Sequence, residues 1–253
     1  MLVVDQSGHG PDLALLHGWG MHGGVWESLV PILAERHRVH VVDLPGHGAS
    51  TLSTPFTLQQ VARDVSCALP PRCALLGWSL GGQVAMQIAL DAPTQVERLL
   101  LIGTTPCFRQ REDWPHGQDA AMMREFLRGL AQDYEGTLNR FLSLQARSGE
   151  AARAVIARLR ETLFARGRPD LTSLLGGLAI LSEIDLRQAV HAITQPTLIV
   201  HGTHDLLTPL AAAEWLAGQL PAAQLATIAG AAHAPFLSHP AQTLDLLQGF
   251  LHG

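Results

Sequence analysis

Short, predominantly apolar runs alternate with helical patterns along most of this chain. The apolar runs span residues 13–17, 37–42, 73–76, 98–102, 197–205 and 223–230. Helical periodicity is found at residues 26–34, 58–69, 80–91, 211–220 and 243–251. Strands that are apolar along their whole length are buried on both faces, which is typical of a parallel sheet covered by helices. The sequence therefore predicts an α/β fold with a mostly parallel central sheet.

The alternation stops between residues 106 and 187. This stretch contains no convincing strand, but it has helical patterns at residues 120–145 and 150–164. At 253 residues the chain is long enough for one domain and an insertion. We predict an α/β core formed by residues 1–105 and 188–253, with a helical lid formed by residues 106–187.

Bulk composition excludes several classes of protein. With 47% hydrophobic and 15% charged residues, the chain has the composition of an ordered globular protein. Its net charge of −5 argues against general nucleic-acid binding. No apolar run is long enough to cross a bilayer, and no signal peptide is visible. Three cysteines without metal-ligand spacing suggest free thiols. We expect a cytoplasmic protein.

Charge is distributed unevenly between the predicted lid and the rest of the chain. Residues 109–187 hold 12 arginines and 11 acidic residues, whereas the remainder holds 5 and 11. Arg153 and Arg160 are seven residues apart and should share one helix face. On charge alone, a solvated helix face is the favoured explanation. The other explanation is a docking surface for an acidic partner.

The pentapeptide G-W-S-L-G at residues 77–81 matches the nucleophile elbow, with a strand before it and a helix after it. A sharp strand-to-helix turn strains the backbone of Ser79 and exposes its hydroxyl, and side chains at Gly77 and Gly81 would collide. The start of the helix behind Ser79 also presents free N–H groups to developing negative charge. Taken alone, the pentapeptide is compatible with an ordinary glycine-rich turn.

An acid and a base follow Ser79 in the order that this chemistry requires. Asp205 comes just after an apolar strand, and His233 lies in the loop after the next one. A neutral imidazole can take the serine proton, and a carboxylate on its other nitrogen stabilises the imidazolium. Separately, an aspartate at a strand end often caps a helix and a loop histidine is often solvated. Asp43 is a poor second choice for the acid because it precedes Ser79.

An oxyanion hole needs two N–H donors. We expect them to be the backbone N–H groups of Leu80, after the nucleophile, and Trp19, in the loop after the first strand. The indole of Trp19 is expected to form a wall of the acyl pocket. His201 and His204 flank a strand end beside Asp205, but they offer no third ligand, so we predict no metal site.

These motifs resemble the α/β-hydrolase superfamily over essentially the whole chain. More narrowly, the chain resembles the BioH family of pimeloyl-[acyl-carrier protein] methyl ester esterases, which serve biotin synthesis. The narrower resemblance is carried by LLHGWGMHGGVW, VVDLPGHGAS, GWSLGGQVAMQIAL, TTPCFRQREDWP, RFLSLQ, GGLAILSEIDLR and AAHAPFLSHPA.

The resemblance implies a cytoplasmic serine esterase that releases methanol from the carrier-bound methyl ester without a metal or other cofactor. It implies that Ser79 is the nucleophile, Asp205 the acid and His233 the base, with Trp19 and Leu80 as the oxyanion hole. The substrate would contact these residues, apart from the acid, and the lid segment Phe141, Leu142, Ser143, Leu144 and Gln145.

The resemblance also implies that arginines of the lid hold the acidic carrier protein. Arg140 and Arg153 match such positions, whereas a further arginine of the pattern is replaced by Gly136. The remaining lid candidates for this contact are Arg147, Arg158 and Arg160. We expect a monomer.

Two other functions use the same residues differently. A general short-chain esterase, or a related hydrolase of lactone or C–C bonds, would need the triad but no carrier protein. A binding or receptor module on a hydrolase scaffold would not need the whole triad.

Overall fold

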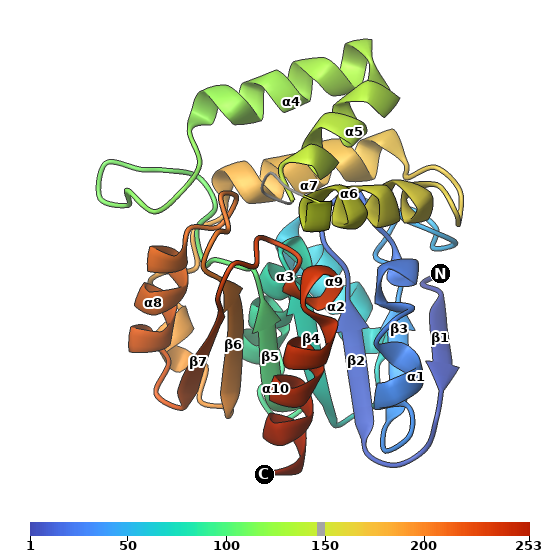
Figure 1. Ribbon diagram of the computed structural model, residues 1–253, viewed down its shortest axis with the longest axis vertical. Coiled ribbons are helices and arrows are strands. Elements are labelled where there is room, and N and C mark those ends of the chain that lie inside the picture. Colours follow the sequence, from blue (N-terminus) through green and yellow to red (C-terminus); the bar gives the residue numbers. More distant parts are fainter. Residues whose placement is uncertain (146–149) are drawn as a thin grey trace.

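The computed structural model describes residues 1–145 and 150–253, and its centre is one seven-stranded sheet (Figure 1). The strand at one edge is antiparallel to its neighbour, and the other neighbouring strands are parallel. The mostly parallel sheet confirms the predicted fold class. In spatial order the strands are β1 (Val4–Ser7), β3 (Arg38–Val42), β2 (Asp12–Leu16), β4 (Cys73–Trp78), β5 (Val96–Ile102), β6 (Thr197–Gly202) and β7 (Ala223–Ile228).

The edge strand β1 was not predicted from the sequence. Its residues, VDQS, contain one apolar side chain, and three of the four are exposed. An exposed edge strand lacks the apolar run that marks a buried one, so only its pairing with β3 reveals it. The central strands β4 and β6, in contrast, are buried along their whole length.

Helices cover both faces of the sheet, as the apolar strands require. In Figure 1, α10 (Pro240–His252) lies in front of the sheet, and α2 (Leu58–Ala68) and α3 (Leu80–Asp91) lie behind it. The shorter α9 (Pro235–Ser238) precedes α10, and α8 (Leu210–Gln219) lies between β6 and β7 in the sequence.

The single helix expected at residues 26–34 is wrong. The structure has a 3₁₀ helix, η1 (Gly23–Trp26), and a one-turn helix, α1 (Val30–Leu33). The reason is Pro31, which suits the first turn of α1 but has no N–H to continue a helix begun earlier. A second 3₁₀ helix, η2 (Val190–Ala192), precedes β6.

Four helices are inserted between β5 and β6, and they lie together above one end of the sheet (Figure 1). They are α4 (Ala120–Gln132), α5 (Tyr134–Ser143), α6 (Glu150–Leu163) and α7 (Leu171–Glu183). Asp133 separates α4 from α5, and its carboxylate accepts the N–H of Gly136 at 2.9 Å. We call these four helices, together with the residues that connect them, the lid. The limits of the lid given above, residues 106 and 187, stay a prediction.

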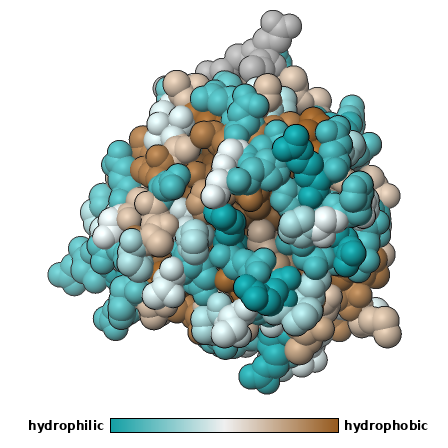
Figure 2. All heavy atoms as spheres, turned by 90° about the horizontal axis from the view of Figure 1, so that it is seen from below, coloured by the Kyte–Doolittle hydropathy of each residue, from teal (hydrophilic) through white to brown (hydrophobic). Residues whose placement is uncertain are grey.

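Polar side chains and smaller apolar patches are interspersed on the face seen from below in Figure 2. Such mixing is ordinary for a protein surface in contact with water. Among the described residues, no helix combines the length and the apolar character needed to span a bilayer.

Candidate active site

Ser79 lies between β4 and α3 in a conformation that L-residues rarely adopt, with φ 56° and ψ −118°. The neighbouring strand holds this turn in place. The N–H of Ser79 donates to the carbonyl of Ile102 at 3.0 Å, and the hydroxyl of Thr104 donates to the carbonyl of Ser79 at 2.7 Å. The backbone strain at Ser79 is therefore balanced by hydrogen bonds from β5 and the residues after it.

The two glycines of the elbow are required because the backbone crosses itself closely here. A Cβ atom at Gly77 would lie 2.3 Å from the carbonyl oxygen of Gly81. A Cβ atom at Gly81 would lie 2.4 Å from the carbonyl oxygen of Leu16, at the end of β2. The collisions expected at both glycines are therefore with backbone atoms, those of Gly81 and Leu16.

Asp205 and His233 come together although they are 28 residues apart in the sequence. The Nδ1–H of His233 donates to Oδ2 of Asp205 at 2.8 Å, and both side chains are buried. The other carboxylate oxygen of Asp205 accepts the N–H groups of Leu207 and Thr208, each at 2.9 Å. The carboxylate is thus fixed on both oxygens.

Electrostatics keep this buried carboxylate ionised. Burial opposes the charge, but the attraction of His233 and the hydrogen bonds from His233 and Thr208 hold the pKa of Asp205 below its ordinary value. An ionised Asp205 can stabilise an imidazolium on His233.

Gly103, directly after β5, provides the space in which this pair meets. It has φ +49°, and a Cβ atom there would lie 2.8 Å from the carbonyl oxygen of His233. The same Cβ atom would lie 3.4 Å from Oδ2 of Asp205. A larger residue would push His233 and Asp205 out of position.

The other candidate acid, Asp43, serves a different purpose. Its carboxylate accepts the N–H of Gly23 at 2.7 Å and the N–H of Ala49 at 3.0 Å, so it joins two turns of the core.

His201 lies against Asp205, and its Nε2–H donates to the carbonyl of Thr208 at 2.6 Å. Burial lowers the pKa of His201, so this side chain is a neutral packing partner of Asp205.

The loop after β2 carries Trp19, and its backbone is oriented by His17. The N–H of Leu44 donates to Nε2 of His17 at 2.9 Å, which places the ring proton on Nδ1. That Nδ1–H donates to the carbonyl of Gly18 at 2.8 Å. Because the carbonyl of Gly18 and the N–H of Trp19 belong to one peptide plane, His17 also directs the N–H of Trp19. Within the described chain, neither this N–H nor that of Leu80 donates to a protein acceptor.

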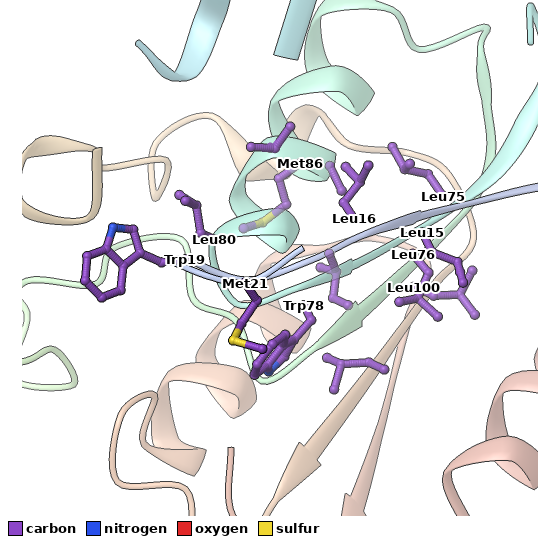
Figure 3. Packing of buried hydrophobic residues seen from close by; sticks show 14 of the residues in the cluster. Leu15, Leu16, Trp19, Met21, Leu75, Leu76, Trp78, Leu80, Met86 and Leu100 are labelled. Carbon is purple, nitrogen blue, oxygen red and sulfur yellow. The ribbon is translucent and has the colours of Figure 1, made fainter. Parts of the chain in front are cut away.

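The indole of Trp19 connects this loop to the lid. Its Nε1–H donates to the carbonyl of Leu174 in α7 at 2.9 Å. Its ring meets Phe141 of α5 edge to face, with centroids 4.7 Å apart. Figure 3 shows Trp19 extending away from the leucines of the sheet. The side chain expected to form a wall of the acyl pocket therefore lies where core and lid meet.

The predicted substrate-contacting segment of the lid divides into buried and exposed residues. Phe141, Leu142 and Gln145 are buried, whereas Ser143 and Leu144 are exposed. The carbonyl of Gln145 accepts the N–H of His233 at 3.2 Å, which joins this segment to the base. Contact of these five residues with substrate stays a prediction.

The lid arginines differ in how much of their charge is already paired. Arg158 bonds Glu27 of the core at 2.8 Å, and Arg140 forms an ion pair with Asp133 at 3.6 Å and bonds the hydroxyl of Thr137 at 2.7 Å. Arg153 and Arg160 are exposed on α6, and neither forms an ion pair with a described side chain. Arg147 lies outside the described residues.

Sequence reasoning assigned no role to His17, Gly103 or Thr208. His17 lies in a motif that was noted for its glycines. Thr208 follows the proposed acid by three residues, and this spacing is equally typical of an aspartate that caps a helix. Gly103 carries no signal, because a glycine after a strand is common in every α/β fold.

Comparisons with known proteins show the family of the chain. A family model described as the alpha/beta hydrolase fold matches residues 13–240. The pimeloyl-[acyl-carrier protein] methyl ester esterase of Nitrosomonas europaea is 45% identical over 239 residues, which cover 94% of this chain and 95% of that protein. The protein of the same name from Aeromonas hydrophila is 43% identical over 250 residues, which cover 98% of each chain.

Solved structures are similar over the full length. A hydrolase from Pseudomonas aeruginosa superposes with a TM-score of 0.87 at 30% identity, covering 100% of this chain and 94% of the other. An esterase from Exiguobacterium antarcticum reaches a TM-score of 0.90 at 24% identity, covering 100% and 96%, and supports the fold alone.

Proposed function

The chain belongs to the family of pimeloyl-[acyl-carrier protein] methyl ester esterases within the α/β hydrolases, and we propose that its Ser79, His233 and Asp205 carry out that reaction. The substrate is the methyl ester of pimeloyl-[acyl-carrier protein]. The products are pimeloyl-[acyl-carrier protein] and methanol.

The first half of the reaction forms an acyl-enzyme. The hydroxyl oxygen of Ser79 attacks the ester carbonyl carbon while Nε2 of His233 takes the hydroxyl proton. The negative charge on the former carbonyl oxygen is stabilised by the N–H groups of Trp19 and Leu80. The C–O bond to the methoxy group then breaks, and His233 returns the proton to give methanol.

The second half restores the enzyme. A water molecule gives a proton to His233 and attacks the acyl carbon, and the same two N–H groups stabilise the second oxyanion. Collapse of this intermediate breaks the bond to Ser79, and His233 reprotonates the serine oxygen. Throughout, Asp205 stays ionised and stabilises the imidazolium of His233.

The single observation that supports this assignment most strongly is the buried 2.8 Å hydrogen bond from His233 to Asp205. It fixes the proton on Nδ1 and leaves Nε2 free to act as a base. A capping aspartate or a solvated loop histidine would not be buried together in this way. The strained backbone of Ser79 is a second observation in favour of catalysis.

The proposal is tested with p-nitrophenyl butyrate and with the carrier-bound methyl ester. We expect Ser79→Ala to abolish turnover of both substrates while the protein stays folded. Wild-type rates in this variant would refute the nucleophile assignment. In addition, the intact gene should restore biotin-free growth to a strain lacking its own esterase, and the Ser79→Ala gene should not. Failure of a well-expressed intact gene would favour the general short-chain esterase.

For docking of the acidic carrier protein, we propose the lid arginines. Arg153 and Arg160 are the strongest candidates, because Arg158 and Arg140 already bond side chains of this chain. Exposed charges of this kind steer an oppositely charged partner towards the lid. We further propose that the enzyme acts as a monomer in the cytoplasm, where its three cysteines stay free thiols.

A further inference from the structure

The residue before the proposed nucleophile makes a direct hydrogen bond to the proposed base. Trp78 ends β4, and its indole Nε1–H donates to the backbone carbonyl of His233 at 2.9 Å. Both residues are 1% exposed. The bond joins two residues 155 positions apart in the sequence, and it lies away from water, where a hydrogen bond is strengthened by the low local dielectric.

The other polar groups of His233 are held as well. Its N–H donates to the carbonyl of Gln145 in the lid at 3.2 Å, and its Nδ1–H donates to Asp205 at 2.8 Å. The loop carrying the base is therefore fixed at its carbonyl by Trp78, at its N–H by the lid and at its ring by the acid. Only Nε2 has no described protein partner, and this is the atom that must take the serine proton.

Packing holds the indole in the orientation that this hydrogen bond needs. The ring of Phe236 meets Trp78 edge to face, with centroids 5.1 Å apart. On the loop before Trp19, a Cβ atom at Gly18 would lie 3.1 Å from Cε3 of Trp78, so the indole lies directly against this backbone. The ring of His233 itself lies 5.7 Å from the indole, centroid to centroid.

The neighbouring Trp26 shows how a tryptophan that only fills space differs. It belongs to the same aromatic cluster, with its centroid 6.4 Å from that of Trp78 and 4.6 Å from that of Phe236. Trp26 is fully buried, but its Nε1–H has no hydrogen-bond partner among the described residues. Two tryptophans thus share one environment, and only Trp78 directs its donor to the base.

We infer that Trp78 is a positioning residue of the esterase: its indole N–H fixes the backbone of His233 so that the ring keeps its hydrogen bond to Asp205 and its Nε2 stays available to take the serine proton. The inference rests on the proposed triad and does not depend on the carrier protein. A base displaced by about 1 Å can lower a rate about 100-fold, so loss of this hydrogen bond should lower kcat while substrate binding is kept.

The test compares Trp78→Phe with Trp26→Phe, which make the same change in size within one cluster. With p-nitrophenyl butyrate, we expect Trp78→Phe to lower kcat about 10- to 100-fold with KM within about twofold, and Trp26→Phe to keep kcat. The low-field proton resonance of the His233–Asp205 hydrogen bond should broaden or vanish in Trp78→Phe and persist in Trp26→Phe. Equal kcat values and equal spectra in the two variants would overturn the inference.

A second variant covers the possibility that Trp78→Phe does not fold. Trp78→3-benzothienylalanine, introduced at this position alone, exchanges the N–H for sulfur in a ring of nearly the same shape. We expect it to lose kcat as Trp78→Phe does, and a kcat within twofold of wild type would refute the inference. Activity in Ser79→Ala, in contrast, would refute the triad itself, so the two failures are distinguishable.

Discussion

The hydroxyl of Thr208 donates a 2.6 Å hydrogen bond to Oδ2 of Asp205, the same carboxylate oxygen that accepts the hydrogen bond from Nδ1–H of His233. This bond helps to hold the pKa of Asp205 below its ordinary value. Thr208 thereby supports the charge of the carboxylate that His233 contacts.

Thr208→Val should weaken that support at nearly unchanged volume. The pKa of Asp205 should rise towards its ordinary value, because the carboxylate loses a donor that favours its charged form. Unfolding free energy at neutral pH should fall by about 1–3 kcal/mol, and it should decline less steeply than that of the wild type as the pH falls through the acidic range. Urea unfolding from neutral to acidic pH checks this. Thr208→Ser keeps the hydroxyl and is the control; identical pH profiles for Val and wild type would contradict the prediction.

Asp205→Asn should lower kcat by about 10³- to 10⁴-fold, because an amide cannot stabilise the imidazolium and favours the wrong tautomer. KM should change little. The matched control is Asp43→Asn, which also alters a buried carboxylate at a strand end. It should lower the unfolding free energy, since the N–H groups of Gly23 and Ala49 lose a charged acceptor, but it should keep kcat. The reverse pattern would identify Asp43 as the acid.

Gly103→Ala should damage both stability and turnover. Its positive φ is unfavourable for alanine, and the added Cβ would approach the carbonyl of His233 to 2.8 Å. We expect unfolding free energy to fall by about 1–3 kcal/mol and kcat to fall with it. Gly249→Ala, in α10, has no heavy atom within 4 Å of its added Cβ and should be neutral or stabilising. Urea unfolding and steady-state kinetics of both variants decide between these outcomes.

Reversing two lid charges should affect the carrier-bound substrate alone. For Arg153→Glu with Arg160→Glu, we expect KM for the carrier-bound ester to rise about tenfold or more at low ionic strength, and less at high salt. Hydrolysis of p-nitrophenyl butyrate should not change. The control is Arg63→Glu, which reverses an exposed charge on α2, outside the lid. An equal loss on both substrates would rule out a docking role.

Stability should depend on a buried histidine of the core. Burial lowers the pKa of His47 to about 4, so the folded protein excludes a proton that the unfolded chain binds below about pH 6.5. The contribution of His47 to the free energy of unfolding is therefore complete above pH 6.5, and it declines by up to about 3 kcal/mol as the pH falls towards 4.

Urea unfolding between pH 4 and 7 tests that dependence. His47→Phe keeps a ring beside Phe56, whose centroid is 6.4 Å from that of His47, and removes the titrating group. The free energy of unfolding of this variant should fall less steeply on acidification than that of the wild type. Parallel curves for the two proteins would show that His47 does not carry the effect.

Much of the fold could be predicted because its signals are local. The apolar runs that became β2, β4 and β6 are nearly continuous in the sequence, because these strands are buried on both faces. Local chemistry also explains the failures. β1 has polar side chains and is defined only by its partner strand, and Pro31 divides a region that hydrophobic periodicity treats as one helix.

For the candidate site, the order of the residue types can be read from the chain alone: a serine at a glycine elbow, then an aspartate and a histidine after consecutive strands. Which of their groups touch depends on how the chain folds. Trp78 donates to His233, Gly103 leaves space for it, and the lid carbonyl of Gln145 accepts its N–H. These contacts join segments that are distant in the sequence, and residue spacing carries no information about partners brought together by the packing of the sheet and lid.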